Sequence, residues 1–248
     1  MIPVFDNRRI IEFVISLFPG EHDFLFICRQ AHLDDTDMAQ VLGQLMPTGR
    51  VIGIEGAKKG PVWAVAQAFD HIDDDKPCIV NYCDFYMRWD YQGFKQTMET
   101  SGADGGIPSY KGFHPHLLHP NNYYASCLVD QDNWMIEIRE KYSFTTDKSL
   151  SPQSGGTYYM RTGAILKKYY QQMLDQDIKL NGEYYSSLVY NLMQADGHRT
   201  LIYDRVSHFC QWGTPEDFEE YQYWQRIFTD YAKQFAPNSI QPSTQSLA

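Results

Sequence analysis

An α/β fold with a mostly parallel central sheet flanked by helices is the architecture that the sequence predicts. Short apolar runs alternate with segments whose apolar residues recur at helical spacing, which is the rhythm of βαβ units. The runs are apolar throughout, as in strands that are buried on both faces. The 248 residues, 43% of them hydrophobic, suffice for one large domain.

The elements of the first half follow this alternation in order. Ile10, Val14 and Leu17 recur at helical spacing in a helix expected over 7–18, which ends at Pro19 because proline cannot continue a helix. Strands are then expected at 23–28, 50–54 and 78–82, and helices at 34–45 and 62–71.

The second half is less regular. We expect helices at 91–100, 163–174 and 183–194, and strands at 105–108, 123–129, 135–139, 156–160 and 200–203. The last helix starts at Pro215, because Thr214 can cap it and Glu216 lies at the positive end of its dipole. We assign 1–236 to a single domain and expect the tail 237–248, rich in Ser, Pro and Gln, to be disordered.

Charge and composition exclude some classes of protein, such as those that bind nucleic acid through a basic surface. The 21 basic and 31 acidic residues give a net charge of -10, which excludes a basic nucleic-acid surface but not a mononucleotide held by a few local cations and amides. No apolar stretch approaches the roughly 20 residues of a membrane-spanning helix. No leader pattern opens the sequence, so we expect a cytoplasmic protein without membrane insertion. Five cysteines without CxxC spacing are expected as reduced thiols, and a homo-oligomer is compatible with the sequence.

A carboxylate directly follows the expected strand at 78–82. Ligands collect beyond the carboxyl ends of parallel strands, and Asp84 there can hold Mg²⁺ against phosphate oxygens. Asn81, in the same segment, is assigned to nucleotide binding. The alternative for Asp84 is that it only caps the following turn.

The segment 55–61 occupies the same kind of position one βα unit earlier. Gly60 and Pro61 stand where a backbone can approach a ligand closely and where amides of the next helix can accept an anion or a base edge. The segment matches neither the P-loop nor the dinucleotide pattern, so a plain turn is the alternative.

Further motifs follow in order along the chain: Ile138-Arg139-Glu140-Lys141, Ser154-Gly155-Gly156-Thr157-Tyr158, Asn181-Gly182-Glu183 and Gly213-Thr214-Pro215-Glu216-Asp217. Together with 1–15, the turn at 60–64 and Asp84, this succession resembles the sugar-1-phosphate nucleotidyltransferases, also called nucleotide-sugar pyrophosphorylases. Within that family it is most similar to members encoded with capsule or surface-polysaccharide genes.

The resemblance implies a GT-A-type fold of the nucleotide-diphospho-sugar transferases. It implies an enzyme that transfers an NMP from an NTP to a sugar-1-phosphate or similar phosphate acceptor, releasing pyrophosphate with Mg²⁺ as cofactor. The residues carried over are Asp84 and Lys141 as catalytic, Asp84 as metal ligand, Gly60, Pro61, Asn81 and Asp84 for the nucleotide, and Glu140, Lys141, Gly156 and Glu183 for the substrate.

Two departures from the family pattern keep alternatives open. The family opens with a strand and a glycine-rich phosphate loop that this sequence lacks, so we expect the first strand to be missing and its two neighbours to have exposed edges or to pair directly. Gln211 stands where many members have a second metal-binding aspartate. The alternatives are a GT-A glycosyltransferase, although Asp84-Phe85-Tyr86 lacks the usual Asp-x-Asp pair, and a catalytically inactive domain that binds a nucleotide or nucleotide sugar.

Three histidines, His114, His116 and His119, lie in one expected loop. His-x-His can chelate zinc, but no Cys or acid stands at a supporting spacing. We expect a solvent-exposed loop, with contact between His114 and a substrate hydroxyl or phosphate as the functional alternative.

Overall fold

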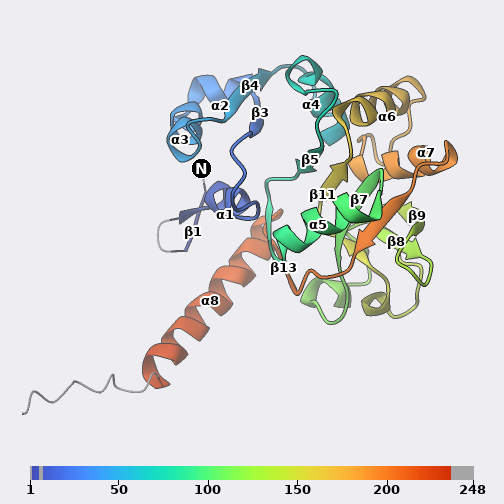
Figure 1. The fold of residues 1–248 in the computed structure, drawn as a ribbon. Helices are drawn as coiled ribbons and strands as arrows, with labels where there is room; N and C mark the ends of the chain where they lie inside the picture. Colours follow the sequence, from blue (N-terminus) through green and yellow to red (C-terminus); the bar gives the residue numbers. More distant parts are fainter. Residues whose placement is uncertain (1, 6–7, 236–248) are drawn as a thin grey trace, which may run out of the picture.

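The computed structural model describes residues 2–5 and 8–235 and has a central seven-stranded sheet (Figure 1). Six of its strands follow one path, and a seventh pairs with β7. In spatial order the path is β5 (Cys78–Asn81), β11 (Thr157–Met160), β7 (Gly105–Tyr110), β10 (Gln153–Ser154), β8 (Ser126–Val129) and β9 (Met135–Arg139), with β12 (Thr200–Tyr203) beside β7.

The α/β class, with a central sheet flanked by helices, is confirmed, but the strand directions differ from the expectation of a mostly parallel sheet. β12 pairs with β7 in parallel, whereas β11 runs antiparallel to both β5 and β7. β8 and β9 form an antiparallel hairpin that extends the sheet through β10. β11 lies between β5 and β7 and runs against both of them. Because these strands are far apart in the sequence, no local pattern reveals this pairing.

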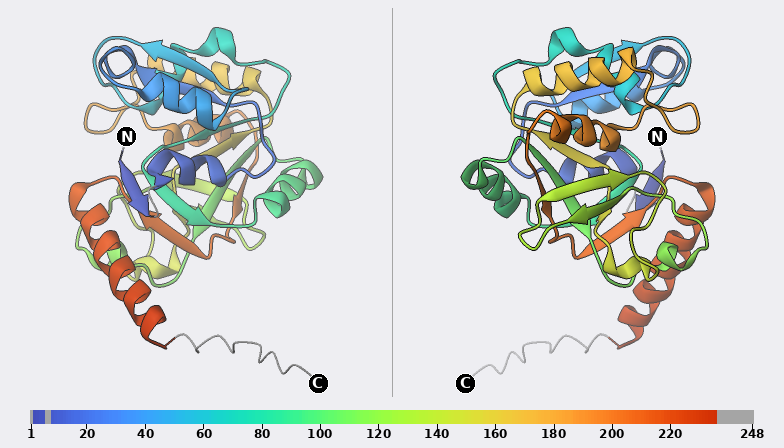
Figure 2. Two further views of the ribbon diagram at one scale, coloured as in Figure 1. Left: turned by 90° about the vertical axis from the view of Figure 1, so that its left-hand side faces the viewer. Right: turned by 90° about the vertical axis from the view of Figure 1, so that its right-hand side faces the viewer.

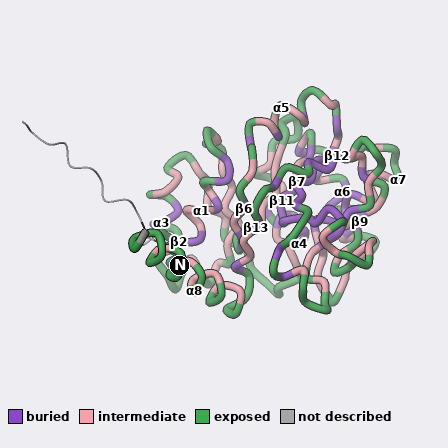
Figure 3. Tube along the Cα trace, turned by 90° about the horizontal axis from the view of Figure 1, so that it is seen from below, coloured by how far each residue is buried: buried purple, intermediate pink, exposed green. Residues whose placement is uncertain are grey.

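Helices cover both faces of the sheet, and alternate side chains of each strand face opposite layers. Tyr158, Met160 and Ile202 pack into a core beneath α4, α6 and α7, whereas Tyr159 and Tyr203 pack toward α5. Buried positions concentrate along β7, β11 and β12 (Figure 3). The helices are α4 (Pro61–Ala66), α5 (Tyr91–Ser101), α6 (Gly163–Asp175) and α7 (Val189–Ala195).

The expected strands at 23–28 and 50–54 form a separate sheet. β3 (Leu25–Arg29) and β4 (Arg50–Ile54) pair in parallel, joined by α2 (Gln30–Asp35) and α3 (Met38–Leu45). Within the described residues β3 pairs with β4 alone, and β5 with β11 alone. Each strand therefore has one edge without a strand partner, and both are only partly buried.

The remaining elements assemble around Trp212, which packs with Val4, Ile10 and Val14. They are β1 (Pro3–Phe5), β2 (Arg8–Arg9), α1 (Ile10–Ser16), β6 (Phe85–Arg88), β13 (His208–Gln211) and α8 (Pro215–Phe235). Figure 2 shows α8 running away from the body.

Short 3-10 turns complete the fold: η1 (Phe69–His71), η2 (Pro115–Leu118), η3 (Lys148–Leu150) and η4 (Ser186–Leu188). Of the helices in the described residues, none combines the length and apolarity needed to cross a bilayer. The expected disordered tail, 237–248, lies outside the described residues.

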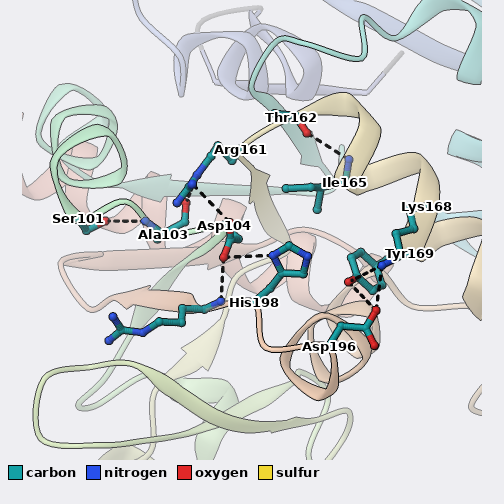
Figure 4. A network of polar contacts seen from close by, with 11 residues as sticks. Ser101, Ala103, Asp104, Arg161, Thr162, Ile165, Lys168, Tyr169, Asp196 and His198 are labelled. Atoms are coloured by element: carbon teal, nitrogen blue, oxygen red, sulfur yellow. Dashed lines mark hydrogen bonds and ion pairs between the residues drawn. The ribbon is translucent and has the colours of Figure 1, made fainter.

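Asp104, just before β7, contacts residues that follow β11 and precede β12, at one end of these strands (Figure 4). Its carboxylate accepts a hydrogen bond from the Arg199 backbone amide at 3.0 Å and lies 3.2 Å from His198 Nδ1 and 3.5 Å from Arg161 Nη1. Arg161 Nε in turn donates to the Ala103 carbonyl at 3.0 Å. The Asp104 side chain is only 20% exposed, although the Arg161 side chain that it contacts is 43% exposed.

We expect Asp104→Ala to lower the free energy of unfolding by about 1–3 kcal/mol, because it removes a partly buried acceptor from the Arg199 amide and from the Arg161 and His198 side chains. Urea denaturation monitored by circular dichroism measures this change. Asp175→Ala, at the exposed end of α6, is the matched control and should shift stability by less than about 0.5 kcal/mol. Equal shifts in the two variants would contradict this role for Asp104.

Candidate functional site

Asp84 lies between β5 and β6, directly beside the end of β13. The pairing of β6 with β13 sets Gln211 opposite Phe85, and the Trp212 backbone amide donates to the Asp84 carbonyl at 2.9 Å. A Cβ added to Gly213 would lie 3.0 Å from Asp84 Oδ2. The carboxylate therefore occupies space that a side chain at position 213 would fill.

The charge of Asp84 is set by competing effects. Asp84 is exposed at the surface, yet the protein around its carboxyl limits hydration and raises its pKa, while a hydrogen bond from its own backbone amide and the positive charge of Lys58 oppose that shift. Burial also raises the pKa of Tyr124, and the negative charge of Asp84 raises it further. Lys58 is thus the cation that acts on this carboxyl, and Tyr124 is a neighbour that stays protonated.

Gln211 is already engaged as a hydrogen-bond acceptor. The Tyr124 hydroxyl donates to Gln211 Oε1 at 2.6 Å, which leaves the amide oxygen with limited capacity for a metal ion. No group of three or more His, Cys, Asp or Glu side chains that could hold a metal ion occurs in the described residues. Asp84 is therefore the carboxylate on which metal binding at this edge would depend.

The Gly60–Pro61 turn packs against the segment that carries Glu183. Gly60 has φ +98°, and a Cβ there would lie 2.6 Å from the Tyr184 backbone nitrogen and 2.8 Å from its carbonyl oxygen. The Tyr184 amide donates to the Lys59 carbonyl at 2.9 Å. Close backbone packing accounts for the glycine, and it brings the turn and Glu183 together.

Lys58 connects this turn to Asp84. Its Nζ lies 3.8 Å from Glu183 Oε1, and its charge also acts on the Asp84 carboxyl. Tyr185 donates its hydroxyl to Glu183 Oε2 at 2.8 Å. The Lys58 side chain is 79% exposed, so it is free to turn toward an incoming anion.

Glu140 and Lys141 follow β9 and differ sharply in environment. Glu140 accepts a short hydrogen bond from the Ser187 hydroxyl, and burial raises its pKa to about 7, opposed by Ser187 and by the charge of Lys141. Lys141 is exposed, has φ 52°, and places its Nζ 5.6 Å from the centre of the Tyr185 ring. Through Tyr185 the Glu140–Lys141 pair adjoins Glu183.

Asn81 is the last residue of β5, and Gly156 directly precedes β11, the strand that pairs with β5. Thr157 donates a short hydrogen bond to Asn81 Oδ1, and the Tyr82 amide donates to the Gly156 carbonyl at 3.0 Å. Gly156 has φ +93°, and a Cβ there would lie 3.0 Å from the Tyr82 ring and 3.1 Å from the Phe85 ring. These contacts hold the strand end that precedes Asp84.

The loop that carries His114 is largely exposed, as expected, but His114 itself is buried. His114 and His116 are each only 7% exposed. The His114 ring lies 4.5 Å from the Tyr110 ring, and the Tyr110 hydroxyl is 2.7 Å from His116 Nε2. The pair is buried because Phe209 stacks on Tyr110 and supplies a wall that is distant in sequence. His114 is not joined to the other candidate residues by these contacts.

Sequence reasoning missed several residues that contact the candidate site residues. No sequence pattern marks Tyr82 as part of the site. In the structure its hydroxyl accepts a hydrogen bond from the Ser186 amide at 3.3 Å, and its ring packs on Gly156. Ser187 binds Glu140 across a separation in sequence that no local pattern reveals. Lys58 carried a weak signal, since it belongs to the glycine-containing turn that the sequence singled out.

The chain is similar to known proteins in its fold. No protein-family model and no curated protein sequence matches the chain. A nucleoside-diphosphate-sugar pyrophosphorylase from Vibrio cholerae RC9 is similar with a TM-score of 0.70 and 15% identity over 90% of each chain. The chain has the fold of a nucleotidyltransferase.

Two further solved structures support this assignment of the fold. An inositol-1-phosphate CTP transferase from T. maritima has a TM-score of 0.66 and 15% identity over 90% of this chain and 84% of that one. A candidate glucose-1-phosphate thymidylyltransferase from Bacillus anthracis, in complex with a sucrose, has a TM-score of 0.66 and 13% identity over 91% of this chain and 85% of that one.

We expect Gly60→Ala to destabilise the protein more than Gly182→Ala, by about 1–3 kcal/mol of unfolding free energy. Both glycines have positive φ, +98° and +83°, so both substitutions strain the backbone. Only at Gly60 does the added methyl group meet backbone atoms, because nothing lies within 4 Å of the Cβ position at Gly182. Chemical denaturation of both variants checks this, and equal losses would contradict it.

The raised pKa of Glu140 predicts a pH-dependent stability. The folded protein holds this proton more tightly than the unfolded chain, so the stabilisation is complete below pH 4.5 and is lost as the pH rises through about 7. Glu140→Gln keeps an acceptor for Ser187 but removes the titration. We expect the wild type to lose about 1–3 kcal/mol relative to this variant across that interval.

Urea unfolding of both proteins at several pH values between these limits measures the difference. Glu99→Gln, at an exposed position of α5, is the control and should follow the wild-type profile. Parallel profiles for the wild type and Glu140→Gln would show that Glu140 has an ordinary pKa.

Proposed function

We propose that the protein is a nucleotidyltransferase that transfers an NMP from an NTP to a sugar-1-phosphate or a similar phosphate acceptor, with release of pyrophosphate. The proposal is supported above all by Asp84, whose carboxylate stands just after β5 and directly beside Gly213, where phosphate oxygens and a cation could reach it. Lys58, in the turn before α4, adds a cation whose Nζ lies 3.8 Å from Glu183 Oε1. The fold that the chain shares with pyrophosphorylases and a CTP transferase agrees with this reaction.

A magnesium ion fits the proposal only as a partner of the nucleotide. Mg²⁺ commonly takes one or two protein carboxylates and completes its shell with water and phosphate oxygens. Asp84 offers one carboxylate, and Gln211 offers an amide oxygen already bonded to Tyr124. Asp84 would hold the ion, which when bound supplies neutralisation of phosphate charge. The two side chains by themselves do not form a metal site.

The chain's own residues would divide the remaining work. The main chain at Gly60 and Pro61, with Asn81, would position the nucleotide, while Glu183 would accept hydrogen bonds from sugar hydroxyls. In the reaction an acceptor phosphate oxygen attacks the α-phosphorus, the bond to the bridging oxygen breaks, and pyrophosphate leaves. Lys141 would offset the charge that develops on the phosphates.

Glu140 and Gly156 take supporting roles in this proposal. Glu140 lies between Ser187 and Lys141, where it can orient the lysine and a bound acceptor. Gly156 provides the close packing that fixes the strand end before Asp84. His114 is left out because it is buried among aromatic rings. We place the reaction in the cytoplasm, in nucleotide-sugar synthesis for surface polysaccharide.

A second candidate is a domain that binds a nucleotide or nucleotide sugar without turning it over. The observation that favours it is the Tyr124–Gln211 hydrogen bond, which commits the amide at a place where a second metal-binding carboxylate would act. A GT-A glycosyltransferase has less support, because Asp84-Phe85-Tyr86 provides only one of two usual acids.

The test is pyrophosphate release from each common NTP, with Mg²⁺ and a panel of sugar-1-phosphates. We expect release with at least one pair of substrates, and we expect Asp84→Asn to slow it on the order of 100-fold because charge neutralisation at the phosphates is lost. Asp132→Asn, in an exposed turn, is the control and should retain wild-type activity.

Calorimetry with nucleotide and Mg²⁺ distinguishes the candidates. Binding that Asp84→Asn abolishes, without pyrophosphate release by the wild type, would favour the binding domain. An unchanged affinity in Asp84→Asn would mean that Asp84 serves only the local turn. No binding of any nucleotide or nucleotide sugar would exclude all three functions.

A further inference from the structure

Gln211, the last residue of β13, lies at the same edge as Asp84. The amide of Trp212, the next residue, donates to the Asp84 carbonyl at 2.9 Å, which holds the end of β13 against the segment that carries Asp84. Burial and the negative charge of Asp84 raise the pKa of Tyr124, whose hydroxyl contacts Gln211. The Gln211 amide is therefore a neighbour of the Asp84 carboxylate.

Tyr124 determines which way the Gln211 amide points. Its hydroxyl donates to Gln211 Oε1 at 2.6 Å, and burial raises the pKa of this phenol, so the hydroxyl keeps its proton. Among the described residues this hydroxyl has no other acceptor. Reversing the amide would leave the proton without a partner, so the oxygen faces Tyr124 and the nitrogen faces away from it.

The nitrogen of the same amide is unused. Within residues 2–5 and 8–235, Gln211 Nε2 has no hydrogen-bond partner. The residue is only half-buried, and Nε2 keeps contact with solvent, whereas the neighbouring Trp212 Nε1 is enclosed. Two N–H donors are thus available to a ligand that approaches Asp84.

These donors suit an anion and not a cation. An amide binds a metal ion through its oxygen, and here Tyr124 engages that oxygen. A phosphate oxygen accepts hydrogen bonds and therefore needs donors. Asp84 offers only acceptors, and the Lys58 side chain, whose charge opposes the rise in the Asp84 pKa, is 79% exposed. The Gln211 nitrogen supplies a donor that is held in place by a second side chain.

We propose that Gln211 binds an oxygen of the nucleotide's phosphate chain through Nε2 and does not bind the metal ion. The inference rests on the proposed nucleotide site at Asp84. It assigns to direct phosphate recognition a position where a second carboxylate could hold the ion. Tyr124 is a positioning residue, because its hydroxyl holds the amide in the orientation that presents Nε2.

Calorimetry with pyrophosphate, at Mg²⁺ concentrations from trace to saturating, tests the role of Gln211 without turnover. Gln211→Met keeps the size of the side chain and removes both polar atoms. We expect it to weaken pyrophosphate binding about tenfold at every Mg²⁺ concentration, because a hydrogen bond to a charged oxygen is lost. The loss of a metal ligand would instead be offset by saturating Mg²⁺. Gln176→Met, at the exposed C-terminal cap of α6, is the matched control and should bind like the wild type.

Two further variants separate the amide's donor from its shape and its support. Gln211→Glu still offers Tyr124 an acceptor, but its other oxygen repels phosphate. Its pyrophosphate affinity should fall in trace Mg²⁺ and recover as Mg²⁺ rises, because two carboxylates can then share the ion. Tyr124→Phe should weaken binding about threefold in the wild type and leave Gln211→Met unaffected, since the hydroxyl acts through the amide.

The proposal would be overturned by a Gln211→Met defect that disappears in saturating Mg²⁺, by wild-type binding in that variant, or by a wild type that does not bind pyrophosphate. Pyrophosphate release judges the transferase separately. An inactive protein in which Gln211→Met still binds pyrophosphate more weakly would keep this role for Gln211 and lose the transferase function. An active enzyme with normal binding in Gln211→Met would lose only the role of Gln211.

Discussion

The pairing of β11 with β5 is the constraint on which the rest of the candidate site depends. Thr157 faces Asn81 in this ladder, and the Gly156 carbonyl accepts the Tyr82 amide just beyond it. These bonds fix where β5 ends and therefore where Asp84 emerges. The side chains of the same segments pack into the core on one face and toward α5 on the other. The contacts that build this part of the sheet therefore also position Asp84.

Electrostatics at this edge differ from those of the molecule as a whole. The chain has a net charge of -10, yet the substrates proposed for it are anions. Lys58 and Lys141 are both exposed and lie beside carboxylates that keep them near the strand ends. Local cations of this kind can attract phosphate even where the average potential is negative, since exposed charges are screened within about 10 Å.

Local sequence predicted most strands of the central sheet and the helices around it, but not the short strands β6, β10 and β13, nor which strands pair with one another. The apolar run before Asp84 identifies a strand, and a carboxylate after it lies at the strand's end whatever the order of the sheet. The reversed direction of β11 and the bond from Ser187 to Glu140 depend on pairings between distant segments. The burial of the His114 ring was missed for the same reason, because the ring packs against Tyr110, which in turn stacks on the distant Phe209.

Lys58 and Asp84 follow strands that belong to two different sheets, and this affects how the site can respond to a ligand. Lys58 follows β4, whereas Asp84 follows β5, and no backbone ladder in the described residues joins the two sheets. The turn that carries Lys58 is instead held by backbone hydrogen bonds from the Tyr184 amide to the Lys59 carbonyl and from the Val62 amide to the Tyr184 carbonyl. The Lys58 side chain is 79% exposed, so it can change its distance from Asp84 by rotation about its own bonds, without breaking a strand pair.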